Sequence, residues 1–227
     1  MSELLDRPVW HALTGRQSHL AVAHGAAVRI DPGYGMFAAL RDPSRECWDA
    51  LAATFVGVND TVGLVEADLP RPSAAFHVLR EAELVQMVWD GGDVPPEHDP
   101  RIVPLGESDA TEMAELAHAT EPGPWSTRTH RYGAFYGILV DGRLAAMAGE
   151  RLLLPGLAEV SGVCTWPEFR GQGLAAALVR KVIHGFQLRG DRPFLHCYGD
   201  NTGAIHLYEK MGFHLRRRMS LLVLALS

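Results

Sequence analysis

Alternating and helically spaced apolar positions predict a chain of mixed helices and strands. In the first ninety residues, 20–24 and 26–30 read as a short hairpin around Gly25. Ser44 is expected to begin a helix, because a serine that precedes a helically spaced apolar run is a favoured N-cap. Residues 61–67 and 82–89 are expected to form further strands.

The second half of the chain shows a longer series of elements. The turn Asp141-Gly142 predicts a hairpin, since Asp-Gly is a favoured two-residue turn. Apolar residues at 174, 177, 178 and 182 have helical spacing. The expected strands are 101–105, 134–140, 143–154, 158–166, 193–199 and 220–226, and the expected helices are 108–120, 173–190 and 201–212. We expect the order β-α-α-β-β-β-α-β-α-β in this half, with a second helix after the first.

A stretch rich in glycine, proline and acidic residues, 90–100, interrupts the apolar pattern on both sides. We interpret it as a linker between an N-terminal α/β domain, residues 1–89, and a second domain, residues 101–227. The N-terminal domain is hypothesised to be a degenerate copy of the second domain that covers the substrate.

Composition and charge exclude several classes of protein. The 227 residues are 47% hydrophobic and 21% charged, which is typical of globular chains, and the net charge of −6 argues against nucleic acid as a partner. Three cysteines without a C-x-x-C pair argue against disulfides and structural zinc. The first residues lack the pattern of a signal peptide, and the apolar run 221–226 is too short to span a bilayer. We therefore expect a cytoplasmic protein with no membrane partner.

The run from Arg170 to Ala175, RGQGLA, lies between a predicted strand and a predicted helix. Backbone N–H groups at a helix N-terminus form an anion site, and glycines let a phosphate approach the main chain closely. The run lacks the Gly-Lys-Ser/Thr of a P-loop and is not G-x-G-x-x-G, so neither NTP nor NAD is favoured.

Two blocks of sequence resemble the GNAT superfamily of acetyl-CoA-dependent N-acetyltransferases. Residues 163–175, VCTWPEFRGQGLA, are similar to its motif A, with Arg170, Gly173 and Ala175 at the signature positions. Residues 201–213, NTGAIHLYEKMGF, resemble the N-x-x-A-x-x-[LF]-Y-x-x-x-G-F block of its penultimate helix. The first block also resembles the glycine N-acyltransferase-like branch. The resemblance covers about residues 100–227 and not the N-terminal part.

The resemblance implies an α/β (α+β) GNAT fold, with a mixed, mostly antiparallel sheet flanked by helices, and acetyl-CoA as co-substrate without a metal. A bulged strand frees main-chain groups for a ligand, so contact with the thioester and pantetheine is expected there. The implied cofactor-binding residues are Val163, Cys164, Thr165, Arg170, Gly171, Gln172, Gly173, Leu174, Ala175 and Asn201.

Two residues are candidates for catalysis. The resemblance implies that Tyr208 protonates the departing thiolate and that Glu159, eleven residues before Arg170, accepts a proton from the amine. Glu150, His196 and Tyr198 are alternative bases. Tyr208 could instead be a core aromatic residue.

Three further features have competing interpretations. Asn201 could simply cap a helix, and Cys164 is expected to be a packed core thiol rather than a nucleophile. Arg216, Arg217 and Arg218 could attract the cofactor's 3′-phosphate or an acidic partner, or could form a solvated face.

We therefore predict transfer of an acetyl group from acetyl-CoA to a primary amine by direct attack in a ternary complex. The acceptor would be a small-molecule or peptide amine. The alternative is a catalytically silent CoA-binding module. The apolar last strand makes a homodimer conceivable.

Overall fold

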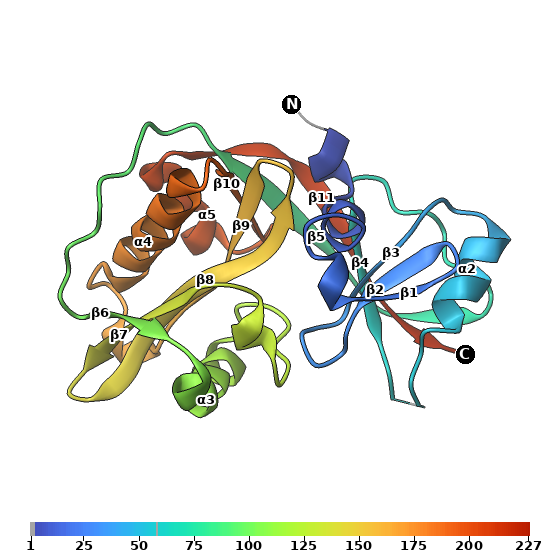
Figure 1. Ribbon diagram of the computed structural model, residues 1–227, viewed down its shortest axis with the longest axis horizontal. Coiled ribbons are helices and arrows are strands. Elements are labelled where there is room, and N and C mark those ends of the chain that lie inside the picture. Colours follow the sequence, from blue (N-terminus) through green and yellow to red (C-terminus); the bar gives the residue numbers. More distant parts are fainter. Residues whose placement is uncertain (1–2, 58) are drawn as a thin grey trace.

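The computed structural model describes residues 3–57 and 59–227, and within them the chain forms an eleven-stranded sheet of order β1-β2-β3-β4-β11-β5-β10-β9-β8-β7-β6. Figure 1 shows two lobes, with β1 to β4 and α2 in one and β6 to β10, α3, α4 and α5 in the other. Strands β5 and β11 run from one lobe to the other, and α1 lies between the lobes.

The first lobe contains short elements of the N-terminal half. After α1 (Pro8–Leu13), which lies between the lobes, its elements are β1 (Ala21–His24), β2 (Ala27–Ile30), β3 (Phe37–Leu40), α2 (Arg45–Ala52) and β4 (Val62–Glu66). The hairpin β1–β2 and the start of α2 match the predictions, and the Ser44 side chain accepts a hydrogen bond from the Cys47 N–H. Sequence patterns missed α1 and β3, because each has six residues or fewer and neither carries a clear period.

The second lobe carries the longer elements that the sequence predicted. They are β6 (Ile102–Leu105), α3 (Ala110–Thr120), β7 (Phe135–Val140), β8 (Arg143–Leu154), β9 (Leu157–Thr165), α4 (Leu174–Leu188), β10 (Arg192–Tyr198) and α5 (Thr202–Met211). The expected second helix after α3 is wrong, since that segment holds a 3-10 turn, Thr129–Arg131.

Strands β5 (Phe76–Trp89) and β11 (Phe213–Leu226) pair antiparallel along their whole lengths. Leu222, Leu221 and Ser220 of β11 also pair with β4 in the first lobe, and Leu84 to Val88 of β5 pair with β10 in the second. Both strands are longer than predicted, because charged residues at their exposed positions hide the alternation. The predicted boundary at 90–100 is a loop in the chain, but the sheet continues across it through β5.

The arginine run on β11 holds these strands together. Arg216 and Arg217 form ion pairs with Asp6, and Arg218 pairs with Glu83 on β5. The three arginines therefore pair with carboxylates of this chain. Arg216 is mostly buried, whereas Arg218 remains on the surface, so the solvated-face interpretation holds for Arg218.

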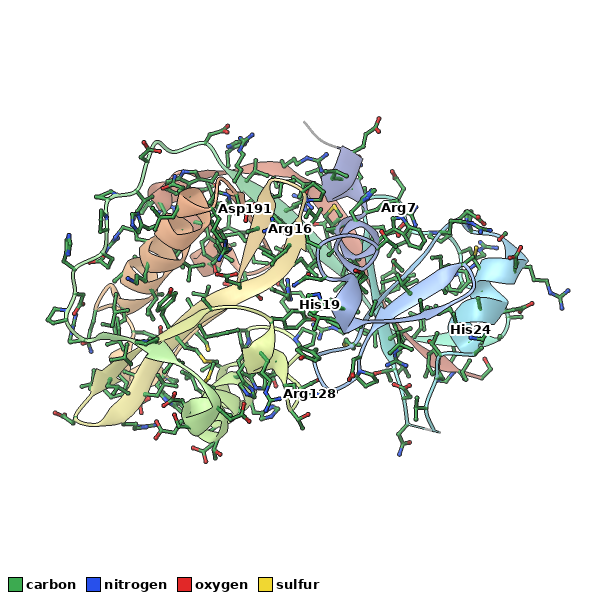
Figure 2. All side chains as sticks on the ribbon, in the orientation of Figure 1. Arg7, Arg16, His19, His24, Arg128 and Asp191 are labelled. Carbon is green, nitrogen blue, oxygen red and sulfur yellow. The ribbon has the colours of Figure 1, made fainter. Side chains whose placement is uncertain are left out.

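Two polar contacts attach the N-terminal segment to the second lobe. The Arg16 guanidinium bonds both carboxylate oxygens of Asp191, at 2.7 and 3.1 Å, and Figure 2 shows this pair. The buried Gln17 side chain donates to the Arg151 carbonyl at 2.6 Å and accepts from the Leu153 N–H at 3.0 Å. Gln17 thus supplies hydrogen bonds to main-chain groups at a bulge in β8, where Arg151 and Leu152 interrupt the pairing with β9.

Strands β9 and β10 diverge in the middle of the sheet. They pair in parallel at Leu157–Arg192, Ala158–Pro193 and Glu159–Phe194. Among the described residues, the pairing of these two strands ends after Glu159 and Phe194. Beyond this point, Gly162 has φ +60° at a second bulge, in β9. The sheet is therefore open between the last residues of β9 and of β10, where ladder groups are free for a ligand.

Candidate active site

A cavity of about 1070 Å³ passes through this opening and reaches both faces of the sheet. Its α4 side is defined by Arg170, Gly171, Ala175, Asn201, Ala204 and Tyr208. Its α1 side is defined by Val9, Phe37, Val65, Leu84, Leu221 and Val223. The volume is at the upper end of that of small-molecule and cofactor sites, so the cavity has room for two reactants.

The turn before α4 has the geometry of an anion site. Gly171 and Gly173 both have φ +77°, and a Cβ on either would meet nothing within 4 Å. Glycine is required there by the backbone angle and not by crowding in this structure. The Ala177 N–H donates to the Gly173 carbonyl at 3.1 Å, so the amides of 174–176 precede the helix ladder and point toward the loop.

The predicted cofactor residues of this turn fall into two groups. Arg170, Gly171 and Ala175 line the cavity. Gln172, Gly173 and Leu174 are not among the residues that line it; the Leu174 side chain is buried in the core, and Gln172 and Gly173 are exposed. Any role for these three in holding a ligand would therefore rest on their backbone amides.

Asn201 is the N-cap of α5 and does not lie inside the helix. Its Oδ1 accepts a hydrogen bond from the Ala204 N–H at 3.1 Å. It also lines the cavity, so its amide nitrogen remains available as a donor. The capping interpretation and the ligand-contact interpretation are thus compatible.

Tyr208 lies on the α4 side of the cavity, one turn beyond Ala204 on α5. Its ring packs edge-on against Phe213, with ring centroids 5.8 Å apart. Burial raises the pKa of its phenol, so the hydroxyl keeps its proton at every physiological pH.

The bulge at Gly162 reverses the alternation of side chains along β9. Val160 and Val163 both pack in the core beneath α4, whereas Cys164 packs in the core beneath α3. A regular strand would place 159, 161 and 163 on one face, and this alternation ends at Gly162 because the bulge adds one residue to the strand. Val163, Cys164 and Thr165 all line the cavity.

Cys164 is a buried thiol. Burial raises its pKa to about 12, so the nucleophilic thiolate is scarce at neutral pH. Its Sγ lies 3.5 Å from the Gly162 carbonyl oxygen. This environment fits the packing interpretation of Cys164.

Glu159 is 0% exposed and lies at the point where β9 and β10 separate. It accepts two hydrogen bonds from the Arg151 guanidinium, at 2.8 and 2.6 Å, and one from the Leu152 N–H at 3.3 Å. His196 Nδ1 lies 2.7 Å from its Oε1 atom. Burial alone would raise the pKa of Glu159, but Arg151 and His196 together lower it to about 2. Glu159 is therefore a carboxylate that holds a proton poorly.

The hydrogen bonds of Gln86 fix the tautomer of His196. The Oε1 of Gln86 accepts from Arg216, so its amide nitrogen donates to the Leu5 carbonyl and faces His196 Nε2 at 2.9 Å. Since that nitrogen is a donor, His196 Nε2 is the acceptor and the ring proton is on Nδ1, toward Glu159. Both ring nitrogens of His196 are thus engaged.

The other two alternative bases are also engaged. Glu150 accepts two hydrogen bonds from the Arg189 guanidinium, at 2.9 and 3.1 Å. The Tyr198 ring lies beneath the Arg80 guanidinium, 4.8 Å from its centroid. Tyr198 lines the large cavity and Glu150 does not.

Sequence reasoning missed Arg151 and Gln86. Arg151 carries no motif, and its inward orientation depends on the bulge in β8. Gln86 could have been found from the sequence, because it is a polar residue inside the apolar run 84–89. In the structure its side chain is 0% exposed.

Comparison with known proteins places the chain in a family. The FR47-like protein family model matches residues 135–222. The chain is 31% identical over 112 residues to the [ribosomal protein bS18]-alanine N-acetyltransferase of Escherichia coli strain K12, covering 46% of this chain and 72% of that one. It is 37% identical over 81 residues to the mycothiol acetyltransferase of Tsukamurella paurometabola, covering 34% and 28%.

Solved structures agree over the full length. A GNAT-family protein from Novosphingobium aromaticivorans superposes with a TM-score of 0.93 at 53% identity, covering 100% of both chains. A GCN5-related N-acetyltransferase from Kribbella flavida has the same fold, with a TM-score of 0.61 at 16% identity, and covers 99% of this chain and 94% of that one. The chain belongs to the GNAT superfamily of N-acetyltransferases and is an acyltransferase. The finer placement in the glycine N-acyltransferase-like branch stays a prediction.

Two features are absent from the described residues. Within 3–57 and 59–227, no helix is long and apolar enough to cross a membrane. In the same part of the chain, no group of three or more His, Cys, Asp or Glu side chains is arranged to hold a metal ion.

Proposed function

We propose that this protein transfers an acetyl group from acetyl-CoA to a primary amine, by direct attack of the amine on the thioester. The observation that carries the proposal is the opening between β9 and β10, with a glycine turn and helix N-terminus beside a cavity that reaches both faces of the sheet. Acetyltransferases of this superfamily use acetyl-CoA as co-substrate, and the relatives named above carry N-acetyltransferase and acetyltransferase names.

The α4 side of the cavity supplies the groups for the cofactor. The amides of the turn at 171–176 face outward from a helix N-terminus, which suits a pyrophosphate. Arg170 adds a positive charge beside them. The main-chain groups of Val163 and the N–H of Thr165 would bond the thioester carbonyl and the pantetheine, with Asn201 as a further donor. The Thr165 carbonyl already accepts a hydrogen bond from Arg170 Nε at 3.3 Å.

Tyr208 provides the proton that the leaving group needs. As the amine nitrogen forms its bond to the acetyl carbon, the carbon–sulfur bond breaks and the sulfur becomes a thiolate. The phenol of Tyr208, protonated and buried, gives the thiolate its proton. The nitrogen loses one proton to solvent in the cavity, and Tyr208 regains one from the same source, so the reaction releases the amide and free CoA.

Glu159 acts as a positioning residue in this scheme. A carboxylate whose pKa is about 2 is a weak base for an ammonium or amine. Its hydrogen bonds orient Arg151 and His196 at the edge of the opening. Glu159 as the base stays a prediction, and its contacts support the positioning role instead.

Substituting Gly173 with Ala tests the cofactor site. Gly173 and Gly190 lie at opposite ends of α4 with φ +77° and +75°, and a Cβ on either would meet nothing within 4 Å. Both Gly→Ala variants should lose about 1 kcal/mol of stability from the left-handed backbone. Because only Gly173 lies in the turn that the pyrophosphate approaches, we expect Gly173→Ala to raise the Kd for acetyl-CoA about tenfold or more, with Gly190→Ala as the matched control. Titration calorimetry measures both, and equal Kd values would remove the turn from the site.

A further inference from the structure

The α1 side of the cavity has a chemical character of its own, apart from the cofactor groups. Its walls come from α1, β3 and β4 of the N-terminal half and from β5 and β11. The residues that define this side are apolar: Val9, Phe37, Val65, Leu84, Leu221 and Val223. An acceptor that fills this space must present an apolar body, because a polar body would lose its hydration without a partner.

Two cations lie among these apolar residues, and one of them is already neutralised. Arg151 lines the cavity with its guanidinium 5.0 Å from the Phe37 ring centroid, and it is paired with Glu159 at 2.6 Å. Arg80 lines the same space from β5, where it lies opposite Val223 of β11. Among the ion pairs of the described residues, Arg80 has no carboxylate partner.

The contact between Arg80 and Tyr198 supports a binding role for the guanidinium. The centroid of the Tyr198 ring lies 4.8 Å from the Arg80 Cζ, a cation–π distance, and no hydrogen bond among the described residues uses an Arg80 N–H. Tyr198 follows His196 by two residues on β10, on the same face of the strand. Arg80 is therefore held near the opening where the amine must meet the thioester.

The other charges of the cavity lie elsewhere. Glu121 follows α3, and Arg170 belongs to the turn before α4. An ammonium group would be repelled by Arg80 and attracted toward Glu121, whereas a carboxylate would be attracted to Arg80. These charges orient an acceptor that carries both groups, with its carboxylate toward β5.

We propose that the acceptor is an amino acid with an apolar side chain, and that Arg80 binds its carboxylate. This inference rests on the proposed acetyl transfer and specifies its substrate class. A guanidinium binds a carboxylate through two parallel N–H bonds, and Arg80 is exposed and lines the cavity, so its guanidinium is accessible to a ligand there.

Release of free CoA from acetyl-CoA tests the proposal with three acceptors that differ in one group: phenylalanine, phenylalaninamide and phenethylamine. For the wild type we expect kcat/KM for phenylalanine to exceed that for both analogues about tenfold or more. Arg80→Met should bring that ratio close to one, and Arg80→Lys should keep part of it, because the charge remains. Arg45→Met is the matched control, since Arg45 lies on α2 with 92% of its side chain exposed and does not line the cavity.

The outcomes separate the two proposals. If CoA is released as fast with phenethylamine or phenylalaninamide as with phenylalanine, the carboxylate site is overturned and acetyl transfer is still supported. A peptide N-terminus that proves the better acceptor would also overturn the carboxylate site, because its α-amine lacks the adjacent carboxylate. If Arg80→Met keeps the wild-type ratio of kcat/KM for phenylalanine to kcat/KM for the analogues, another residue sets the selectivity and the role of Arg80 is overturned. No release with any amine would overturn acetyl transfer itself.

Discussion

Replacing Tyr208 with Phe should lower kcat about 100-fold and leave the KM for acetyl-CoA within about threefold. The substitution keeps the ring that packs against Phe213 and removes only the hydroxyl. Tyr208 lines the cavity and burial raises the pKa of its phenol, so its hydroxyl stays protonated throughout the physiological range. Without it, the thiolate leaves unprotonated. Initial rates of CoA release at varied acetyl-CoA concentration measure both constants.

Tyr136 provides the control for this prediction. Its side chain packs against the same core as Tyr208 but lies outside the cavity. Tyr136→Phe should therefore leave kcat within about twofold. If Tyr208→Phe raises the KM and leaves kcat unchanged, Tyr208 is a packing or binding residue and the proton must come from elsewhere.

Replacing Glu159 with Gln should cost about 3 kcal/mol of unfolding free energy at pH 7. The variant leaves the mostly buried Arg151 guanidinium, 14% exposed, without its carboxylate, and the loss of one partner of a buried ion pair costs about 3–5 kcal/mol. Urea denaturation measures the difference. Glu168→Gln is the control, because Glu168 pairs with Arg143 at a similar distance of 2.7 Å but on the surface, where such a pair contributes less than about 1 kcal/mol.

The same comparison has a predicted pH dependence. The pKa of Glu159 falls from 4.5 to about 2 on folding, so its stabilisation is complete above pH 4.5 and is lost as the pH falls toward 2. The gap between wild type and Glu159→Gln should be constant from pH 5 to pH 7 and should narrow at pH 3. A gap below about 1 kcal/mol at pH 7, or one that does not narrow, would contradict the ionised buried pair.

Activity distinguishes the positioning role of Glu159 from the role of base. A base titrating in the working range would produce an acidic limb in kcat/KM that disappears in the Gln variant. With a pKa of about 2, Glu159 gives no limb above pH 5, so the profiles of the two proteins should have the same shape there. An acidic limb in the wild type that Glu159→Gln removes would restore Glu159 as the base.

The local sequence was sufficient to predict most elements of the second lobe and the turn before α4. Long periodic runs, the Asp141-Gly142 turn and the glycines of 171–173 indicate their structure within a few residues. The length of β5 was not predictable, because its exposed half, beginning at Phe76, reads as polar and is held by pairing with β11. Long-range pairing also explains why the first ninety residues contribute β5 to the middle of the eleven-stranded sheet, next to β10 of the second lobe.

The residues on the cofactor side of the site could be predicted from the sequence, whereas most of those on the acceptor side could not. Arg170, Gly171 and Ala175 lie together because they are neighbours in sequence. Glu159, Arg151 and His196 come together only because β8 bulges and β9 and β10 part after Glu159. Arg80 reaches the cavity from the N-terminal half, so its position follows from the β5–β11 pairing and from no local pattern.

The most direct test of acetyl transfer is the appearance of free CoA when the purified protein is given acetyl-CoA and a panel of primary amines. We predict thiol release that requires both the protein and an amine, and that falls about 100-fold in Tyr208→Phe. Binding of acetyl-CoA without thiol release for any amine in the panel would contradict acetyl transfer and leave a silent CoA-binding module.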